Sequence, residues 1–226
     1  KKTLKKRYSI RGKKYMNDSM FQKLTEDVRL QVKRLEKLDI YTNKHVHNVP
    51  KITLKICQKL NVSEEKTRFY INCAYLHDIG KIFIPYEILQ KPEKLTDEEY
   101  EVMKKHTIKG YELCMAHEDL KKYANAAKYH HENEDGTGYP ECLKKDEIPI
   151  EAKIVKVADL YDAICSRRQY KPEVKRVDAM NIIYENVQKG KVNKKIFNAL
   201  VDVAIDEIQE ENGDIEEIKK LQEMKR

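Results

Sequence analysis

Apolar side chains recur at spacings of three and four residues along most of the chain, a period that is typical of amphipathic helices. No segment alternates apolar and polar residues for long enough to predict a β-strand. The pattern therefore predicts an all-α fold, a helical bundle in which each helix buries one face. We expect helices from Val49 to Leu60, Ser63 to Leu76, Thr96 to Leu113 and Asp119 to His131, and over residues 18–38, 150–166, 173–188, 194–210 and 214–226.

Three of these helices carry start signals in the sequence. Ser63 stands before two glutamates, which predicts an N-cap with favourable charge behind it. A capping box begins at Thr96, and Asp119 is expected to cap the next helix. Residues 132–149 contain two glycines and two prolines, so we expect this stretch to be a loop.

The composition indicates one folded domain with a charged surface. Of the 226 residues, 37% are charged and 40% are apolar, which excludes a disordered chain, and no apolar run approaches the ~20 residues that a membrane span needs. We expect a basic leader at residues 1–17, the domain at 18–211 and an exposed charged tail at 212–226. Much of the net charge of +7 lies in the leader, which we interpret as a solvated arm and not as a DNA or RNA contact.

The cysteines bear on the compartment. They are odd in number and lack C-x-x-C spacing, which indicates reduced thiols in a cytoplasm: Cys57, Cys73, Cys114, Cys142 and Cys165. The chain begins with Lys1 and not with Met, which is consistent with a piece of a longer protein that carries an upstream sensory domain.

The candidate chemistry centres on the end of one predicted helix, where an apolar run stops at His77, Asp78, Gly80 and Lys81. Adjacent helical residues point about 100° apart, so His77 and Asp78 can ligate one ion together only near a helix end, where Gly80 can stop the helix. Alone, such a pair is more often a hydrogen-bonded helix end than a metal site. Further potential ligands elsewhere in the chain favour the metal site over the hydrogen-bonded helix end: His45, His106, His130, His131 and Asp159.

Two segments carry a resemblance to a known family. The first is His77-Asp78-Ile79-Gly80-Lys81, and the second is the eleven-residue run His-His-Glu-Asn-Glu-Asp-Gly-Thr-Gly-Tyr-Pro that ends at Pro140. They resemble the HD-GYP family, bacterial metal-dependent phosphodiesterases of cyclic dinucleotides within the HD phosphohydrolases. The similarity extends from about Asp39 to about Leu200, and the chain departs from the family at Asn48, where the family often has Arg.

The resemblance implies a binuclear metal centre between facing helices. It assigns Asp78 as the bridge between two ions. One ion would be held by His45, His77 and Asp159, and the other by His106, His130 and His131. Five imidazoles and two carboxylates suit two divalent transition metal ions, and iron or manganese fits better than calcium. Hydroxide held between the ions would attack the phosphorus, with His77, Asp78 and Lys81 as the expected catalytic residues.

A cyclic dinucleotide carries two phosphodiesters and needs cationic side chains to hold it. Lys81, Arg168 and Lys171 match the basic positions of the family on the substrate side, whereas without the resemblance each would be interpreted as a surface cation. Gly138-Tyr139-Pro140 contains no metal ligand. The resemblance links this segment to substrate specificity and to contacts with diguanylate cyclase domains, and a purely structural role is an equal alternative.

Three functional hypotheses remain open. The first is hydrolysis of cyclic di-GMP. Some family members hold a third ion with a glutamate four residues before the first histidine, a position that Tyr41 occupies here, so we expect two ions and a linear product, pGpG. The second hypothesis keeps the metals but changes the substrate to another cyclic dinucleotide or nucleotide. The third is a sensor domain that binds cyclic di-GMP without turnover, and the intact ligand set weighs against it.

Overall fold

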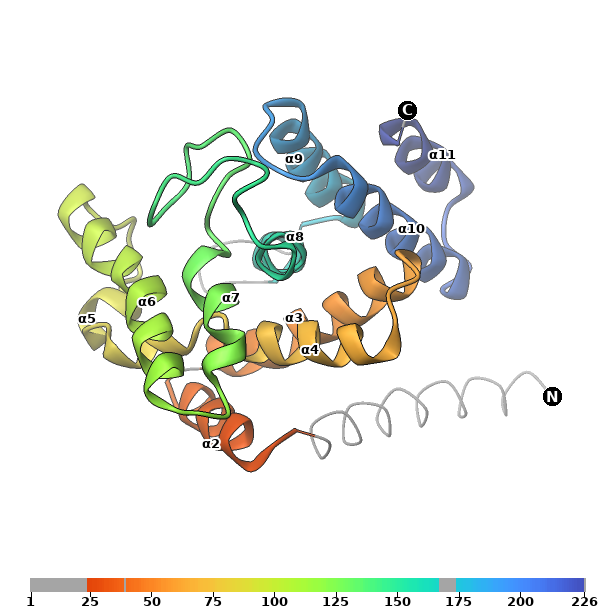
Figure 1. Cartoon of the computed structure of the whole chain (residues 1–226). Helices are drawn as coiled ribbons and strands as arrows, with labels where there is room; N and C mark the ends of the chain where they lie inside the picture. Colours follow the sequence, from red (N-terminus) through yellow and green to blue (C-terminus); the bar gives the residue numbers. More distant parts are fainter. Residues whose placement is uncertain (1–23, 39, 167–173, 226) are drawn as a thin grey trace.

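The computed structural model describes residues 24–38, 40–166 and 174–225. Within these ranges the chain forms helices joined by loops, with one isolated β-bridge between Asp135 and Lys144 and no strand (Figure 1). The all-α prediction is therefore confirmed. The basic leader expected at residues 1–17, together with Arg168 and Lys171, lies outside the described residues.

The helices follow the apolar periodicity of the sequence. The longer ones are α2 (Glu26–Glu36), α3 (Ile40–Lys59), α4 (Glu64–Leu76), α6 (Asp97–Ala116), α8 (Ile150–Cys165), α9 (Arg176–Gln188), α10 (Lys194–Glu210) and α11 (Ile215–Met224). The shorter ones are α5 (Tyr86–Leu89), α7 (Ala124–Tyr129) and the 3-10 helices η1 (Ile79–Phe83) and η2 (Lys121–Tyr123). The segment expected as one helix from Asp119 to His131 is thus divided into η2 and α7.

Helix α8 runs through the centre of the bundle. Figure 1 shows it almost end on, with the other helices around it, and it packs against α3, α4, α7, α9 and α10. Its apolar side chains are buried on several sides, among them Ile154, Val157 and Tyr161. A central helix of this kind carries its polar residues into the interior, so Asp159 and Asp162 lie inside the bundle and not at its surface.

The expected helix starts have mixed outcomes. Ser63 accepts a hydrogen bond from the backbone of Lys66, and Thr96 forms a complete capping box with Glu99, as predicted. The expected cap at Asp119 is wrong. The chain turns there through backbone bonds to the carbonyl of His117, which carry Leu120 into the core and leave Asp119 exposed.

Two glycines allow the candidate site to form. A Cβ atom at Gly80 would lie 1.8 Å from the carbonyl oxygen of His106, so only glycine lets η1 approach α6 this closely. Gly110 lies opposite, where an added Cβ would be 3.2 Å from the backbone nitrogen of Gly80. This contact fixes the end of the His77-Asp78 segment against the helix that carries His106.

The C-terminal helix is less exposed than expected for the tail at residues 212–226. Leu221 and Met224 of α11 are buried, and α11 packs against α9 and α10, because an apolar stripe runs along one face of this charged helix. Among the helices of the described ranges, none combines the length and the apolarity needed to cross a membrane.

Candidate metal centre

The carboxylate of Asp78 lies between two sets of imidazole rings. Its Oδ2 atom is 3.4 Å from Nε2 of His45 and 3.3 Å from Nε2 of His77. Its Oδ1 atom is 3.5 Å from Nε2 of His106 and 3.8 Å from Nε2 of His130. Each oxygen therefore faces a different pair of histidines, which is the arrangement that a bridging carboxylate requires.

The surrounding side chains form two clusters. Within each cluster, the potential ligand atoms all lie within 4.8 Å of one another. We call the first cluster His45, His77 and Asp159, and the second cluster Asp78, His106, His130 and His131. The first cluster combines α3, α8 and the residue directly after α4, while the second combines α6 with the segments directly after α4 and α7. Packing thus joins residues that are more than one hundred positions apart in the sequence.

Backbone carbonyls hold the rings with Nε2 pointing inward. The Nδ1–H group of His77 donates to the carbonyl of Ala74 over 2.7 Å, and that of His106 donates to Met103 over 2.7 Å. His130 donates in the same way to the carbonyl of Ala126, over 3.0 Å. A neutral imidazole carries one proton, so each of these bonds leaves Nε2 as a bare acceptor aimed at the cluster.

Bare acceptors that face one another call for a cation. Nε2 of His106 lies 3.4 Å from Nε2 of His130, and both nitrogens are buried. Burial lowers the pKa of His106 to about 4 and moves the pKa of His130 well below its ordinary value, so neither ring carries a second proton at neutral pH. Nitrogen and carboxylate ligands of this kind suit a divalent transition metal, so the clusters fit divalent metal binding.

His45 differs because carboxylates surround it. Burial alone lowers its pKa, but hydrogen bonds to Asp159, Asp162 and Asp78 outweigh burial and raise the pKa of His45 well above its ordinary value. Its Nε2 atom lies 3.2 Å from Oδ1 of Asp159 and 3.2 Å from Nε2 of His77. In the metal-free chain, His45 therefore carries a second proton that faces Asp159 and His77. A metal ion at this place would satisfy the same two acceptors.

Asp162 holds the outer nitrogen of His45. Its Oδ2 atom accepts from Nδ1 of His45 over 2.7 Å, and its Oδ1 atom accepts from Asn48 over 3.0 Å and from Ser166 over 3.1 Å. Asn48, the departure from the family pattern, thus takes part in orienting a potential ligand. Carboxylate support of an outer histidine nitrogen is common where histidine binds a metal.

Lys81 reaches the centre of the site. Its Nζ atom lies 2.5 Å from Oδ2 of Asp78, one helical turn away. Burial alone would raise the pKa of Asp78, but the charge of Lys81 and the neighbouring imidazole of His77 outweigh burial and hold that pKa well below its ordinary value. The carboxylate is therefore ionised and ready to accept a cation at neutral pH.

The Gly138-Tyr139-Pro140 segment packs on the second cluster. The ring of Tyr139 stacks on the imidazole of His131, with centroids 4.7 Å apart and planes inclined by 19°. A Cβ atom at Gly138 would lie 2.4 Å from Cα of Glu132, so glycine is needed for the loop to fold back this closely. Pro140 follows directly and is half-buried. The segment thus covers one face of His131.

Glu132 fastens this loop. Its side chain is fully buried, and its two carboxylate oxygens accept from the backbone N–H groups of Glu141, over 2.7 Å, and Leu143, over 3.0 Å. A buried carboxylate needs such partners, because an unpaired charge in the interior is strongly unfavourable. Glu132 directly follows His131. It therefore ties the far end of the loop to the segment that carries this histidine.

Comparison with known proteins identifies the family of this chain. Residues 20–196, most of the chain, match the HD domain family. The chain belongs to the HD domain family. The expected HD-GYP membership is confirmed, since the curated relatives of this HD domain include a cyclic di-GMP phosphodiesterase response regulator, RpfG of Xanthomonas campestris pv. campestris. RpfG is 44% identical over 139 residues, which are 61% of this chain and 36% of that protein.

Two further proteins illustrate the range of similar HD domains. The 3'3'-cGAMP-specific phosphodiesterase 2 of Vibrio cholerae is 36% identical over 134 residues, which are 58% of this chain and 25% of that protein. Bd1817, an HDGYP protein from Bdellovibrio bacteriovorus, shares the fold with a TM-score of 0.61 at 22% identity, over 84% of this chain and 63% of that chain. The matched part of the chain corresponds to 36% of the length of RpfG and 25% of the length of the Vibrio cholerae phosphodiesterase.

Sequence reasoning missed how two acidic residues serve this HD domain. The position of Asp162, one turn after Asp159, predicts a bond to a basic residue or to loop backbone. Its partner is the basic side chain of His45, a potential ligand 117 positions away in the sequence. We gave Glu132 no role, although a carboxylate directly after paired histidines could have marked it as a support. In neither case did the sequence identify the partner of the acid.

Proposed function

We propose that this HD domain is a metal-dependent phosphodiesterase that hydrolyses cyclic di-GMP. The observation that carries the proposal is the position of Asp78, whose two oxygens face separate histidine pairs. Support for the substrate comes from relatives such as RpfG, which is named a cyclic di-GMP phosphodiesterase. Because the chain spans only part of these proteins, the activity belongs to the proposal.

The proposed centre holds two divalent ions, with iron or manganese the best match to a mixed imidazole and carboxylate set. Asp78 would bridge the ions, and the remaining members of each cluster would complete each shell. Bound in this way, two ions can activate water and neutralise the charge that develops on a phosphate during in-line attack. The mixed imidazole and carboxylate donor set supports this number and kind of ions.

The side chains of the chain itself supply position and charge. His77, His106 and His130 present their Nε2 atoms at fixed places, because their outer nitrogens are bound to backbone carbonyls. Lys81 lies beside Oδ2 of Asp78 and would meet a non-bridging phosphate oxygen. Arg168 and Lys171 are proposed as further phosphate contacts, and Gly138, Tyr139 and Pro140 as the wall of the substrate site.

The proposed product is linear pGpG. Tyr41 stands in α3 four residues before His45, at the position where some family members hold a third ion with a glutamate. Phenol is a poor replacement for a carboxylate ligand of a hard cation. A centre with two ions is therefore proposed to stop after one phosphodiester has been cleaved.

Purified protein can test this proposal directly. We expect about two equivalents of transition metal per chain, hydrolysis of cyclic di-GMP to pGpG, and loss of turnover after treatment with a chelator. Asp78→Ala should lose metal and turnover, whereas Asp206→Ala should keep both, because it removes an exposed carboxylate of α10 that pairs with Lys59 of α3. Absence of bound metal together with unchanged substrate would overturn the proposal.

One observation favours a second substrate. A relative with 36% identity is named a 3'3'-cGAMP-specific phosphodiesterase, so the mixed cyclic dinucleotide is the alternative to include in the same assay. Faster turnover of 3'3'-cGAMP than of cyclic di-GMP would make 3'3'-cGAMP the proposed substrate, and the proposed metal-dependent hydrolysis would stay the same. Binding of cyclic di-GMP by metal-loaded protein without any product would indicate the sensor hypothesis.

The setting of the domain is also a proposal. We propose that residues 18–211 form the functional unit, with diguanylate cyclase domains or an upstream sensory domain as its partners. A cytoplasmic location is supported by the five cysteines, all of which are free.

A further inference from the structure

A pair of aromatic rings and one cation lie beside the second cluster. The rings of Tyr100 and Tyr139 meet edge to face, with centroids 6.3 Å apart and planes inclined by 83°. Nζ of Lys104 lies 5.5 Å from the centroid of Tyr100 and 5.7 Å from that of Tyr139. We call these three residues the aromatic platform.

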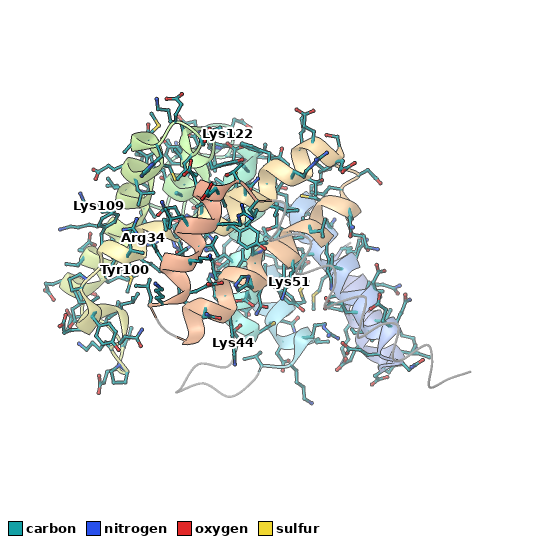
Figure 2. The ribbon with its side chains drawn as sticks, turned by 90° about the horizontal axis from the view of Figure 1, so that it is seen from below. Arg34, Lys44, Lys51, Tyr100, Lys109 and Lys122 are labelled. Atoms are coloured by element: carbon teal, nitrogen blue, oxygen red, sulfur yellow. The ribbon has the colours of Figure 1, made fainter. Side chains whose placement is uncertain are left out.

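The platform is continuous with the candidate metal centre. Tyr139 stacks on His131, so it joins the second cluster to the surface, where the side chain of Tyr100 is 46% exposed. Figure 2 shows Tyr100 at the outer edge of the molecule. A ligand that binds at the cluster can therefore extend across Tyr139 onto Tyr100 without crossing the core.

The first turn of α6 holds the platform in place. The capping box of Thr96 and Glu99 fixes the start of the helix, and Lys91 adds an ion pair to Glu99 over 2.6 Å. Tyr100 follows directly in the sequence. Lys104 pairs over 2.5 Å with Glu101, whose side chain is 66% exposed, so solvent and ligand can compete for this bond. The helix turn that carries Tyr100 is thus fixed, and the ammonium of Lys104 is available.

We propose that Tyr100 and Lys104, together with Tyr139, bind a guanine base of the substrate and select guanine over adenine. This inference rests on the proposed function, since it places the base beside a phosphodiester held at the metal centre. Every base offers a π face that can stack on an aromatic ring, so the exposed ring of Tyr100 supplies affinity without choice. The choice comes from Lys104.

The edges of the two purines differ toward an ammonium. Guanine presents two acceptors, O6 and N7, and lysine commonly donates to both. Adenine presents N7 together with an amino donor at N6, which opposes the N–H groups of Lys104. Guanine-containing cyclic dinucleotides should therefore bind better than cyclic di-AMP.

Binding of hydrolysis-resistant phosphorothioate analogues of cyclic di-GMP and cyclic di-AMP tests the platform on metal-loaded protein. Tyr100→Ala should weaken binding of both analogues by about tenfold, through the loss of stacking, whereas Tyr100→Phe should bind as the unaltered chain does. Lys104→Ala should weaken only the cyclic di-GMP analogue, by about tenfold, and so reduce the preference.

Lys109→Ala is the matched control. Lys109 lies on the same helix, pairs with Glu112 at the same spacing of three residues and points to solvent in Figure 2. Unchanged binding by Tyr100→Ala and Lys104→Ala overturns the platform, while turnover of cyclic di-GMP by the same preparations would leave the proposed function standing. If the metal-loaded, unaltered chain binds neither analogue, both the platform and the cyclic dinucleotide substrate are rejected.

Discussion

Oδ2 of Asp162 lies 2.7 Å from Nδ1 of His45, on the side of the ring opposite the candidate metal centre. The same ring places Nε2 3.2 Å from Oδ1 of Asp159, within the first cluster. A carboxylate on the outer nitrogen fixes the ring and makes its inner nitrogen a better ligand. Asp162 is therefore a support for His45 and does not itself face the proposed ion.

Substitution of Asp162 should weaken metal binding without removing a ligand. We expect Asp162→Asn to lower the affinity of the first cluster by about 10- to 100-fold, because the amide no longer fixes His45 with a charged acceptor. Competition with a coloured chelator measures this affinity. Asp206→Asn, which alters an exposed carboxylate on α10, serves as the control. Equal affinities in the two variants would contradict the supporting role.

The contrast between His45 and Thr96 shows what the sequence could and could not reveal. The capping box at Thr96 is a local signal, complete within four residues, and it formed as predicted. The His45–Asp162 contact joins α3 to α8, and periodicity identifies the buried face of each helix but not the face it meets. Family resemblance supplied the grouping of potential ligands that composition and spacing left open. The supports of those ligands had to come from the fold.

Acid should destabilise the metal-free chain. Burial lowers the pKa of His106 to about 4, and it also lowers the pKa values of His130 and His131. Below the unfolded value of 6.5, the unfolded state therefore binds protons that the folded state does not, and stability falls as pH falls. Each ring contributes up to about 1.4 kcal/mol per pH unit. The raised pKa of His45 opposes this slope only close to pH 6.5, because at lower pH that ring is protonated in both states.

Calorimetry in the presence of a chelator tests this pH dependence. We expect Tm to fall between pH 6.5 and about pH 5, and we expect the slope to be smaller in His106→Gln, which removes one of the three rings. His117→Gln alters an exposed histidine outside both clusters and should keep the original slope. A Tm that rises toward acid would contradict the burial of neutral rings.

Gly80→Ala should destabilise the fold at the contact between η1 and α6. The new Cβ atom would meet the carbonyl oxygen of His106 at 1.8 Å and the backbone nitrogen of Gly110 at 2.5 Å, so backbone must move. We expect a loss of about 3 kcal/mol in the free energy of unfolding, measured by urea titration of the metal-free chain.

Gly190→Ala provides the comparison for that loss. Its Cβ atom would have no neighbour within 4 Å, and only the backbone angle φ of +72° opposes alanine there. This strain alone should cost about 1–2 kcal/mol. If the two variants unfold at the same urea concentration, steric contact with α6 is not what requires glycine at position 80.

Glu132 offers a test of whether the Gly-Tyr-Pro loop supports the metal centre. Its two oxygens bind the N–H groups of Glu141 and Leu143 in a fully buried place. Glu132→Gln keeps one acceptor oxygen and turns an amino group toward the other N–H, whereas Glu132→Ala leaves both N–H groups unpaired. Each lost bond should cost about 1–3 kcal/mol, so the stability should fall from the unaltered chain to the Gln variant and further to the Ala variant.

The metal affinity of the second cluster should fall in the same order, because a loosened loop no longer presses Tyr139 onto His131. Glu147→Gln is the matched control, since Glu147 also accepts a backbone N–H, that of Lys144, but in an exposed place where water can replace it. Chelator competition and urea titration on the same preparations separate the two effects. Reduced stability with full metal affinity would show that the loop is a structural element, and that His131 keeps its position without Tyr139.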